Sequence, residues 1–486
     1  MSLVSLEESL FENAKKNPQK TAVVVGNNRL SYDEVVQNVK AAYLHFKNRS
    51  DLTAGDCIIL AADKQIEFVY AYFGAHLAGL RVAPVDSAIN GDRLSFIVKA
   101  INAKLLVELS VPELHITSLS LSLFSEFSAS DSNEGAIEFP STDSIADILF
   151  TTGTTGIPKG VPLTFKNIAA AARNINTFVG NTAEDVELLA LPLSHSFGLG
   201  RLRCVFEKGG TLVLINGFTN VKKLYRVMAE EKVTGFTMVP ASYRYLKKFS
   251  GERLGEFANQ IKYIEMGSAF FSAEEKQELA DLLPNTRVCM HYGLTEASRS
   301  TFMEFHEDKK DLSSVGKASP YTEAEIFDEN GQIVKIGEEG EICIKGEHVT
   351  GGYLNLPKEE TFYGEYFRTG DWGYKTADGY IYLVSRKKEL INVGGKKVSP
   401  VEVEEQLKKI EGIADCACVG TADPNGILGE VVKALIVKDD GSDISFDEIK
   451  KQMIGKLEDY KIPAVYDWIA EIPKTHNGKI QRLSLK

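Results

Sequence analysis

The stretch Thr151-Thr-Gly-Thr-Thr-Gly-Ile-Pro-Lys-Gly160 follows directly on the apolar run Ile145–Phe150. It holds four threonines, three glycines and one lysine within ten residues. Glycines let a backbone turn tightly and approach a ligand, amides and hydroxyls can face an anion, and a lysine adds a mobile positive charge. The stretch therefore predicts a phosphate-binding loop after a strand. It is not a Walker A loop, because Lys159 is followed by Gly160 and not by serine or threonine.

Length and composition set the class of protein. A chain of 486 residues is too long for one ordinary domain, and its 44% hydrophobic and 25% charged residues are typical of soluble globular proteins. The formal charge of −12 argues against a broad surface for nucleic acid or anionic membranes. The first residues include early acids and no basic region, so no signal peptide is expected, and no apolar run is long enough to span a membrane. The six scattered cysteines form no C-x-x-C pair, which predicts reduced thiols and a cytoplasmic location.

The pattern of elements changes along the chain. Up to about residue 310, helical and strand patterns alternate, beginning with a helix at Leu6–Lys16, a strand at Thr21–Val25 and a helix at Tyr32–Lys47. This βαβ rhythm predicts parallel sheets covered by helices. Beyond residue 310, short strand patterns alternate with turn signals, and a basic cluster near residues 385–389 indicates a boundary. The remaining residues, 389–486, are enough for a separate small α+β domain.

Five segments, taken in order, resemble the adenylate-forming superfamily of acyl-CoA synthetases, peptide-synthetase adenylation domains and firefly luciferase. They are the loop at 151–160, Leu191-Pro-Leu-Ser-His-Ser-Phe-Gly198, Tyr292-Gly-Leu-Thr-Glu296, Tyr366-Phe-Arg-Thr-Gly-Asp371 with the stretch Ser385–Gly395 that follows it, and Pro473-Lys-Thr-His-Asn-Gly-Lys-Ile480. The resemblance implies the α/β class: a large N-terminal domain of parallel or mixed sheets covered by helices with a distorted β subdomain, and a small mobile C-terminal α+β domain. The implied domains are residues 1–385 and 389–486, joined by a hinge at 386–388.

The resemblance also implies an activity in two half-reactions. A carboxylate attacks ATP to give an acyl-adenylate and pyrophosphate, and a thiol then takes the acyl group. The expected reactants and cofactors are a small carboxylic acid, ATP, Mg²⁺ and coenzyme A, with no nucleic acid and no integral membrane contact. Two alternatives stay open: an enzyme that loads the phosphopantetheine of a carrier protein, and a luciferase-like oxygenase. The stretch Asn392–Pro400 resembles stand-alone CoA ligases more closely than the carrier-loading enzymes.

The residues expected at the nucleotide follow from the matched motifs. The β- and γ-phosphates are expected on Thr151, Thr152, Gly153, Thr154, Thr155 and Lys159. Glu296 is expected to hold Mg²⁺ directly or through water, since hard cations prefer carboxylate oxygens, and Thr295 is expected to bond the α-phosphate. Adenine is expected between Tyr292 and the backbone of Gly267, Ser268 and Ala269. The ribose hydroxyls are expected on Asp371, supported by Arg386.

The remaining assignments concern the acid, the thiol and domain rotation. Lys479 is expected to bridge the attacking carboxylate and the α-phosphate, Lys388 to act in the hinge, and Gly394 and Gly395 to line the pantetheine tunnel. His195 is expected to gate access of the acid and the thiol. The acyl pocket is expected at His195, Phe197, Arg201, Gly293 and Arg299. Without the resemblance, His195 and Tyr292 would be core residues, Asp371 a turn former and Lys479 a surface charge.

The predicted acyl pocket contains two arginines. Related CoA ligases carry a small or apolar residue at the position of Arg201, and Arg299 falls in another segment that lines the pocket. A buried guanidinium needs an acceptor, so either the acid carries a second polar group or is short, or both arginines reach solvent or pair with nearby acids. His291 stands where many members have glycine before the tyrosine, and Ser385 replaces a frequent glycine. The first change is expected to alter packing near adenine or the acyl pocket.

Overall fold

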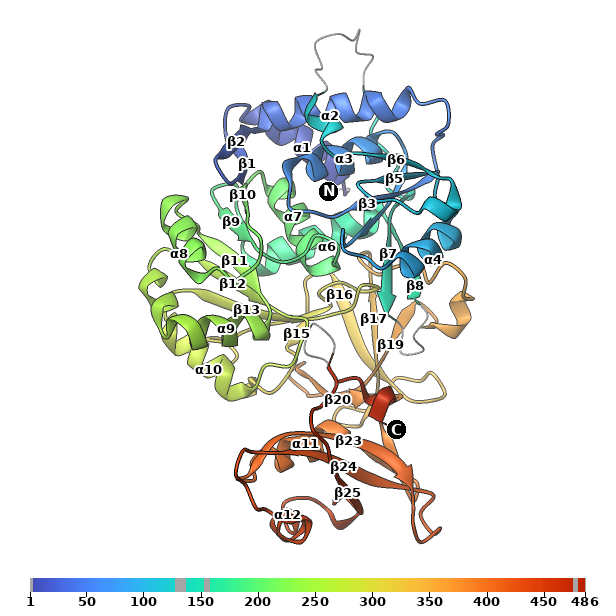
Figure 1. Ribbon diagram of the computed structural model, residues 1–486, viewed down its shortest axis with the longest axis vertical. Coiled ribbons are helices and arrows are strands. Elements are labelled where there is room, and N and C mark those ends of the chain that lie inside the picture. Colours follow the sequence, from blue (N-terminus) through green and yellow to red (C-terminus); the bar gives the residue numbers. More distant parts are fainter. Residues whose placement is uncertain (1–2, 127–136, 153–157, 475–479, 486) are drawn as a thin grey trace. The chain divides into compact units, whose positions relative to one another are not determined.

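The computed structural model describes residues 3–126, 137–152, 158–474 and 480–485 (Figure 1). The chain forms two compact units, one made of Met1–Ala324 and Ile344–Phe367, the other of Glu325–Cys343 and Arg368–Lys486. The α/β fold class is confirmed, and each unit has its own hydrophobic core. The predicted hinge at 386–388 lies within the second unit and stays a prediction, because a hinge is defined by motion between two states.

The first unit contains a nine-stranded sheet in the order β15-β14-β13-β12-β11-β9-β10-β1-β2. Its strands are β1 (Thr21–Val25), β2 (Asn28–Ser31), β9 (Val186–Leu189), β10 (Thr211–Leu214), β11 (Gly235–Met238), β12 (Tyr263–Met266), β13 (Arg287–Tyr292), β14 (Thr301–Glu304) and β15 (Lys317–Ala318). The strands from β13 to β1 are parallel, and β2, β14 and β15 add antiparallel edges. Because parallel strands end at one edge, the segments that follow β9, β12 and β13 lie along the same edge of the sheet.

A second sheet of the first unit has the order β6-β5-β3-β4-β7-β8. Its strands are β3 (Cys57–Ala61), β4 (Arg81–Val85), β5 (Leu105–Val107), β6 (Thr117–Leu119), β7 (Ile145–Thr152) and β8 (Pro158–Thr164). β7 and β8 are antiparallel, with Thr151 opposite Lys159. Thr151 and Thr152 therefore end β7, whereas Pro158, Lys159 and Gly160 begin the antiparallel strand β8. Gly153, Thr154 and Thr155 lie outside the described residues.

The helices of the first unit follow capping and burial signals in the sequence. They are α1 (Leu6–Lys16), α2 (Tyr32–Lys47), α3 (Ile66–Leu77), α4 (Gly91–Ile101), α5 (Leu123–Glu126), α6 (Phe165–Val179), α7 (Ser196–Lys208), α8 (Val221–Glu230), α9 (Pro240–Ser250) and α10 (Ala273–Leu282). Ser31 and Glu34 form the capping box that starts α2. The helices α3, α6 and α7 are buried along most of their length and belong to the core of this unit.

The β-rich region after residue 320 includes a five-stranded sheet, β16-β17-β19-β18, with β20 paired to β19. These strands are β16 (Thr322–Phe327), β17 (Gly340–Gly346), β18 (Phe362–Tyr363), β19 (Tyr366–Lys375) and β20 (Ile381–Arg386). A hairpin of β21 (Ile391–Val393) and β22 (Lys396–Val398) follows. The α+β part comprises β23 (Ile413–Ala422), β24 (Glu430–Lys438), β25 (Val465–Trp468), α11 (Pro400–Leu407) and α12 (Phe446–Met453). Among the residues that the structure describes, no helix is both long and apolar enough to cross a bilayer.

Candidate active site

Tyr353 joins two of the predicted site segments in the first unit. Its hydroxyl donates a hydrogen bond to Oε1 of Glu296 at 2.6 Å. The Nζ atom of Lys159 lies 4.6 Å from the centre of its ring, within range of a cation–π contact. The predicted phosphate lysine and the predicted metal carboxylate thus meet on one aromatic side chain. The sequence reasoning missed Tyr353, although the pair Gly351-Gly352 before an aromatic residue was a usable signal.

The backbone around Tyr353 fixes both segments. The amide of Thr350 donates to the carbonyl of Glu296 at 2.8 Å, and its hydroxyl donates to the carbonyl of Pro162 on β8 at 2.6 Å. The amide of Leu354 donates to the carbonyl of Gly160 at 3.0 Å. A Cβ atom on Gly160 would lie 2.6 Å from Cδ1 of Leu354, so a larger residue here would have to displace the leucine side chain. The segment 350–354 therefore fixes the position of β8 relative to the Tyr292–Glu296 motif.

Glu296 suits a divalent cation. Glu296 is only 6% exposed, and no lysine, arginine or histidine of the described part of the chain forms an ion pair with its carboxylate. A buried carboxylate without a cationic partner is costly unless it is hydrogen-bonded or meets a cation. Mg²⁺ is usually bound by one or two carboxylates together with water and substrate phosphates. The donor set here, one carboxylate beside a predicted phosphate site, fits that pattern.

The predicted adenine segments follow neighbouring strands. Gly267, Ser268 and Ala269 come directly after β12, and Tyr292 ends β13, half-buried. Ser268 has a φ of 72°, a left-handed conformation that is uncommon for serine and often found at functional sites. A Cβ atom on Gly267 would lie 2.2 Å from the ring of His291, so the glycine is required by the histidine that replaces the family's glycine.

The predicted ribose pair comes together in the second unit. Asp371 on β19 lies directly opposite Arg386 on β20. The Nε atom of Arg386 lies 2.8 Å from Oδ1 of Asp371, whose residue is 2% exposed. The amide of Asp371 also donates to the hydroxyl of Thr369 at 3.0 Å. The carboxylate is therefore held in a fixed orientation by its neighbours on the sheet.

The other predicted residues of the second unit lie on turns. Lys388 is exposed in the turn after β20. Gly394 and Gly395 form the two-residue turn between β21 and β22, with φ of 57° and 87°. Two-residue hairpin turns of this kind need positive φ, which glycine supplies without strain. Lys479 lies outside the described residues.

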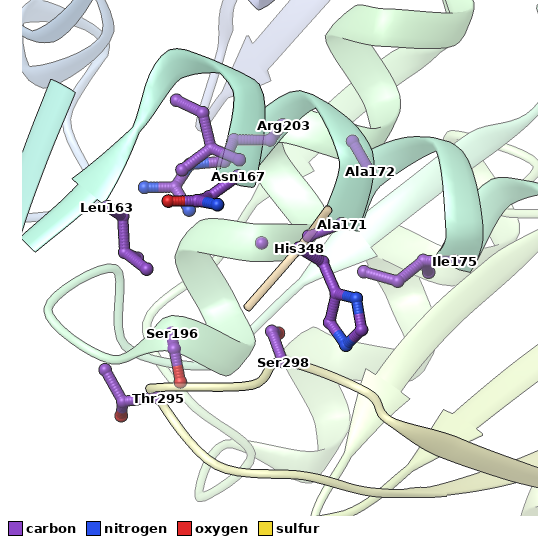
Figure 2. Close-up of a pocket in the computed structure, with 12 residues that line it drawn as sticks. Leu163, Asn167, Ala171, Ala172, Ile175, Ser196, Arg203, Thr295, Ser298 and His348 are labelled. Atoms are coloured by element: carbon purple, nitrogen blue, oxygen red, sulfur yellow. The ribbon is translucent and has the colours of Figure 1, made fainter. Parts of the chain in front are cut away.

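His195 is exposed and occupies the N-cap position of α7. Behind the first turn of this helix is a cavity of about 20 Å³, which is room for one water molecule (Figure 2). Thr295 and Ser196 line it together with residues of α6, Gly200, Arg203, Ser298 and His348. The described residues therefore leave only a small space between Thr295 and the start of α7.

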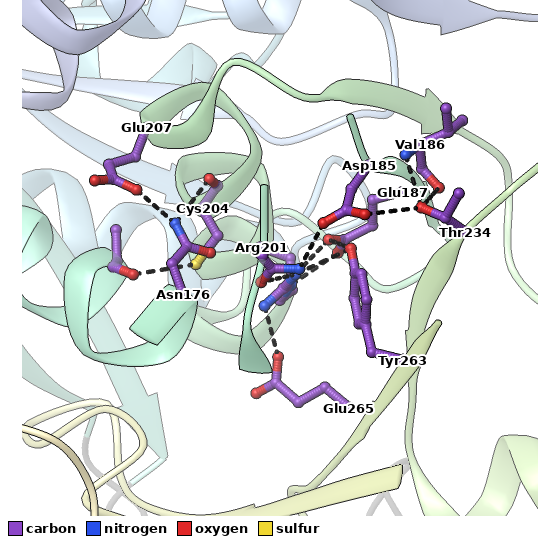
Figure 3. Close-up of polar contacts among 12 residues, drawn as sticks. Asn176, Asp185, Val186, Glu187, Arg201, Cys204, Glu207, Thr234, Tyr263 and Glu265 are labelled. Carbon is purple, nitrogen blue, oxygen red and sulfur yellow. Dashed lines mark hydrogen bonds and ion pairs between the residues drawn. The ribbon is translucent and has the colours of Figure 1, made fainter. Parts of the chain in front are cut away.

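Arg201 belongs to a buried ionic cluster, here called the Arg201 cluster, of Arg201, Glu187, Glu265, Arg299 and His291. Its Nε donates to Oε1 of Glu187 at 2.8 Å, and its Nη1 lies 3.2 Å from Oε2 of Glu265 (Figure 3). Nε of Arg299 donates to Oε1 of Glu265 at 3.0 Å. The structure thus shows the alternative in which both arginines pair with nearby acids.

The Arg201 cluster also ties the start of α7 to the two strand ends. Arg299, with a φ of 54°, donates to the carbonyls of Ser196 and Phe197 at 3.0 and 2.9 Å. Nδ1 of His291 lies 2.7 Å from Oε1 of Glu265, and its ring packs edge-on against Phe197 at 4.6 Å. Burial lowers the pKa of His291 and, together with the two arginines, outweighs the raising effect of Glu265, so the ring is neutral near pH 7. A Cβ atom on Gly293 would lie 2.4 Å from the backbone nitrogen of Arg299, so this turn has no space for a side chain.

A second buried cluster, the Arg203 cluster, comprises Arg203, Asp147, Glu7, His76 and Tyr72. Arg203 pairs with Oδ2 of Asp147, which also accepts from Tyr72 at 2.9 Å. Nδ1 of His76 lies 2.8 Å from Glu7, and its Nε2 lies 3.4 Å from Asp147. Burial by itself would lower the pKa of His76, but Asp147 and Glu7 outweigh it and raise the pKa to about 9. The cluster anchors β7, at whose end the predicted phosphate-binding residues begin, to the three helices α1, α3 and α7.

With this geometry in place, comparison with known proteins decides the family. The family model of AMP-binding enzymes matches residues 10–354, and that of the AMP-binding enzyme C-terminal domain matches residues 402–479. The chain belongs to the AMP-binding enzyme family. The predicted membership of the adenylate-forming superfamily, in its acyl-CoA synthetase branch, is thereby confirmed. The protein is an AMP-forming acid–CoA ligase that makes an acyl-adenylate and then a thioester.

Individual relatives of this AMP-binding enzyme span nearly its whole length. Oxalate–CoA ligase of Arabidopsis thaliana is 28% identical and covers 97% of this chain and 96% of its own. 4-Coumarate–CoA ligase 1 of Narcissus pseudonarcissus is 30% identical, with 99% and 93% covered. The structure of o-succinylbenzoate–CoA synthetase of Bacillus subtilis with ATP and a magnesium ion superposes with a TM-score of 0.85 at 26% identity, covering 98% of each chain. ATP and Mg²⁺ thus bind a homologous structure, and the substrates of the family are a carboxylic acid, ATP and CoA.

Proposed function

We propose that the stretch 151–160, Tyr353 and Glu296 form the pyrophosphate end of the ATP site. The observation that carries this proposal is the contact of Tyr353 with both Lys159 and Glu296. Lysine and magnesium would neutralise the phosphates that leave, and the tyrosine would keep the two charges at a fixed separation. Mg²⁺ bound near Glu296 would supply further neutralisation of the phosphate oxygens. Thr295, which follows Leu294 in the same motif, would bond the α-phosphate.

The remaining nucleotide contacts are assigned by motif. Tyr292 and the Gly267–Ala269 backbone would flank adenine, and Asp371, oriented by Arg386, would accept from the ribose hydroxyls. Lys479 would bridge the attacking carboxylate oxygen and the α-phosphate. Rotation about Lys388 would then replace Lys479 by the face that carries Gly394 and Gly395, so that His195 gates first the acid and then the thiol.

The acid is proposed to be short and to lack a second anionic group. Arg299 and His291 pack against Phe197, and Arg201, at a position that is small or apolar in related ligases, is buried between Glu187 and Glu265. The two guanidinium charges are already balanced by Glu187 and Glu265, and each guanidinium nitrogen of both arginines has an acceptor in the described chain. A second carboxylate would therefore meet no uncompensated positive charge, and a long chain would have to displace a paired, buried cluster.

The acceptor is proposed to be free CoA in the cytoplasm. The stretch Asn392–Pro400 resembles stand-alone ligases, and all six cysteines are free and buried, as expected for a reducing compartment. A carrier-bound phosphopantetheine is the second candidate acceptor. Presenting either free CoA or a holo-carrier protein to the preformed acyl-adenylate separates the two.

An acid series tests this proposal. Acid-dependent exchange of labelled pyrophosphate into ATP, measured without CoA, is expected to be fastest with acids of two to about four carbons and to fall by about tenfold or more for long fatty acids. Oxalate and malonate serve as the charged comparison, and they are expected to be poorer than acetate and propionate. Preference for long-chain or dicarboxylic acids would refute the proposed acid class while leaving the ligase activity intact.

A further inference from the structure

Glu341 on β17 is a buried carboxylate that belongs to none of the five matched segments. Its side chain is 3% exposed, and it lies in the second unit together with Asp371 and Arg386. Its Oε2 atom lies 3.1 Å from Nη2 of Arg368 and 3.0 Å from Nζ of Lys387. A carboxylate is stable in such a buried position when cations and hydrogen-bond donors compensate its charge. Glu341 therefore holds both cations against β17.

The other oxygen of Glu341 binds the backbone directly before Asp371. The amide of Gly370 donates a hydrogen bond to Oε1 of Glu341 at 3.2 Å. Gly370 has a φ of 73°, a left-handed conformation that glycine adopts without strain. The hydroxyl of Thr369 donates to the carbonyl of Ile342 at 2.7 Å and accepts from the amide of Asp371 at 3.0 Å. Two consecutive residues of β17 therefore fix the backbone that carries the Asp371 carboxylate.

Lys387 connects the chain directly after Arg386 to the same carboxylate. The amide of Lys387 donates to the carbonyl of Gly370 at 2.8 Å, and its Nζ atom forms the ion pair with Glu341. Gly370 precedes Asp371 and Lys387 follows Arg386, and the side chains of Asp371 and Arg386 pair at 2.8 Å. Both partners of the predicted ribose pair are thus joined to Glu341 through a neighbouring residue. A change at Glu341 is therefore transmitted to the Asp371 carboxylate from both strands.

We propose that Glu341 is a positioning residue for ribose recognition, because it fixes the direction in which the Asp371 carboxylate faces the ribose hydroxyls. This proposal rests on the proposed function, in which Asp371 accepts hydrogen bonds from those hydroxyls. A carboxylate distinguishes a hydroxyl from a hydrogen atom only when its oxygens are held at hydrogen-bonding distance and angle. Glu341 does not contact the nucleotide itself. It acts through Gly370 and Lys387.

The test compares ATP with 2′-deoxy-ATP and 3′-deoxy-ATP in the acid-dependent pyrophosphate exchange, measured without CoA. In the unmodified protein, kcat/KM for ATP is expected to exceed that for either analogue by about tenfold or more, as for the loss of one hydrogen bond to a charged group. In Glu341→Gln this ratio is expected to fall to about threefold or less, with a higher KM for ATP, because the Asp371 carboxylate is no longer held in one direction. Asp371→Asn gives the ratio without a ribose carboxylate. In that background, Glu341→Gln is expected to change the ratio no further.

Two further variants separate positioning from a general loss of structure. Glu325→Gln removes the ion pair with Lys375, which joins β16 to another part of β19 in the same sheet at 2.8 Å, and is expected to keep the parental ratio. Lys387→Gln leaves Glu341 paired with Arg368, so no buried charge is left uncompensated. It is expected to lower the ratio by about threefold, which gives a result even if Glu341→Gln does not fold.

The ratio of ATP to its analogues decides the inference. A parental ratio in folded Glu341→Gln, or in Lys387→Gln where Glu341→Gln does not fold, would overturn it. A fall in kcat/KM of the same size for ATP and both analogues is such a result, because a general loss of structure affects all three nucleotides alike. If the unmodified protein uses the three nucleotides equally well, the ribose assignment of Asp371 fails and this inference with it. If the unmodified protein discriminates and the variants discriminate equally, only the inference fails.

Discussion

Helix α7 carries two buried arginines, two residues apart, that enter two different clusters. In the Arg201 cluster, two guanidinium groups face two carboxylates, Glu187 and Glu265, and His291 is neutral near pH 7 because its pKa is lowered. In the Arg203 cluster, one guanidinium faces two carboxylates, Glu7 and Asp147, and His76 is protonated because its pKa is raised to about 9. Both histidines are buried. The difference shows that the balance of the surrounding charges, and not burial alone, decides the state of a buried histidine.

The largest effect on stability is expected from removing Glu265, the carboxylate that Arg201 and Arg299 share. Glu265→Ala leaves Arg201 and Arg299 with one acid between them, and an uncompensated buried charge costs about 3–5 kcal/mol. The free energy of unfolding in urea is expected to fall by that amount. Glu230→Ala, which removes an exposed partner of Arg226, is the control and should change it by less than about 0.5 kcal/mol. A loss in Glu265→Ala no larger than in this control would contradict the electrostatic role of the cluster.

The next largest effect is a loss of stability at alkaline pH, caused by His76 of the Arg203 cluster. Because the pKa of His76 rises from 6.5 to about 9 on folding, its stabilisation is complete below about pH 6.5 and is lost as the pH rises through about 9. The shift corresponds to about 3 kcal/mol of unfolding free energy. His76→Gln is expected to lower stability at pH 6 and to flatten its decline between pH 7 and 10, measured by urea titrations across that range. An unchanged alkaline decline in this variant would show that His76 is not the group that titrates.

A smaller effect on stability is expected from His291, whose pKa is lowered on folding and not raised as that of His76 is. Its folded-state pKa lies below 6.5, so the unfolded chain takes up the proton first and stability falls as the pH drops below about 6.5. His291→Gln is expected to reduce this acid-side loss and to leave the alkaline decline of His76 in place. Urea titrations between pH 4.5 and 7 check this. A steeper acid-side loss in the variant would mean that His291 is protonated in the folded protein.

The sequence predicted local structure well where the signals are local. Leu6–Lys16 and Tyr32–Lys47 form helices with the predicted ends, because their caps and apolar faces lie within the segments themselves. Strand β8 was missed, since Pro158 and Gly160 suggest a loop and only pairing with β7 makes a strand. The partners of Arg201 could not be predicted from the sequence either, because Glu187 and Glu265 lie 14 and 64 residues away and no local pattern joins them. The motifs name Lys159, Glu296 and Asp371 as site residues, an assignment that stays a prediction. Tyr353 could not be named in this way, because its contacts with Glu296 and Lys159 join segments far apart in the sequence.

The most direct test of the account is the acid-dependent pyrophosphate exchange of Glu296→Ala beside that of the unmodified protein, titrated with Mg²⁺. Because Glu296 is proposed to hold the magnesium ion beside Lys159 and Tyr353, exchange is expected to fall by about 100-fold or more, on the scale of losing one electrostatic contact to the transition state. Urea unfolding of the variant is measured in parallel and is expected to stay close to that of the parent. Exchange at the parental rate in Glu296→Ala, with an unchanged dependence on Mg²⁺, would contradict the proposed pyrophosphate site.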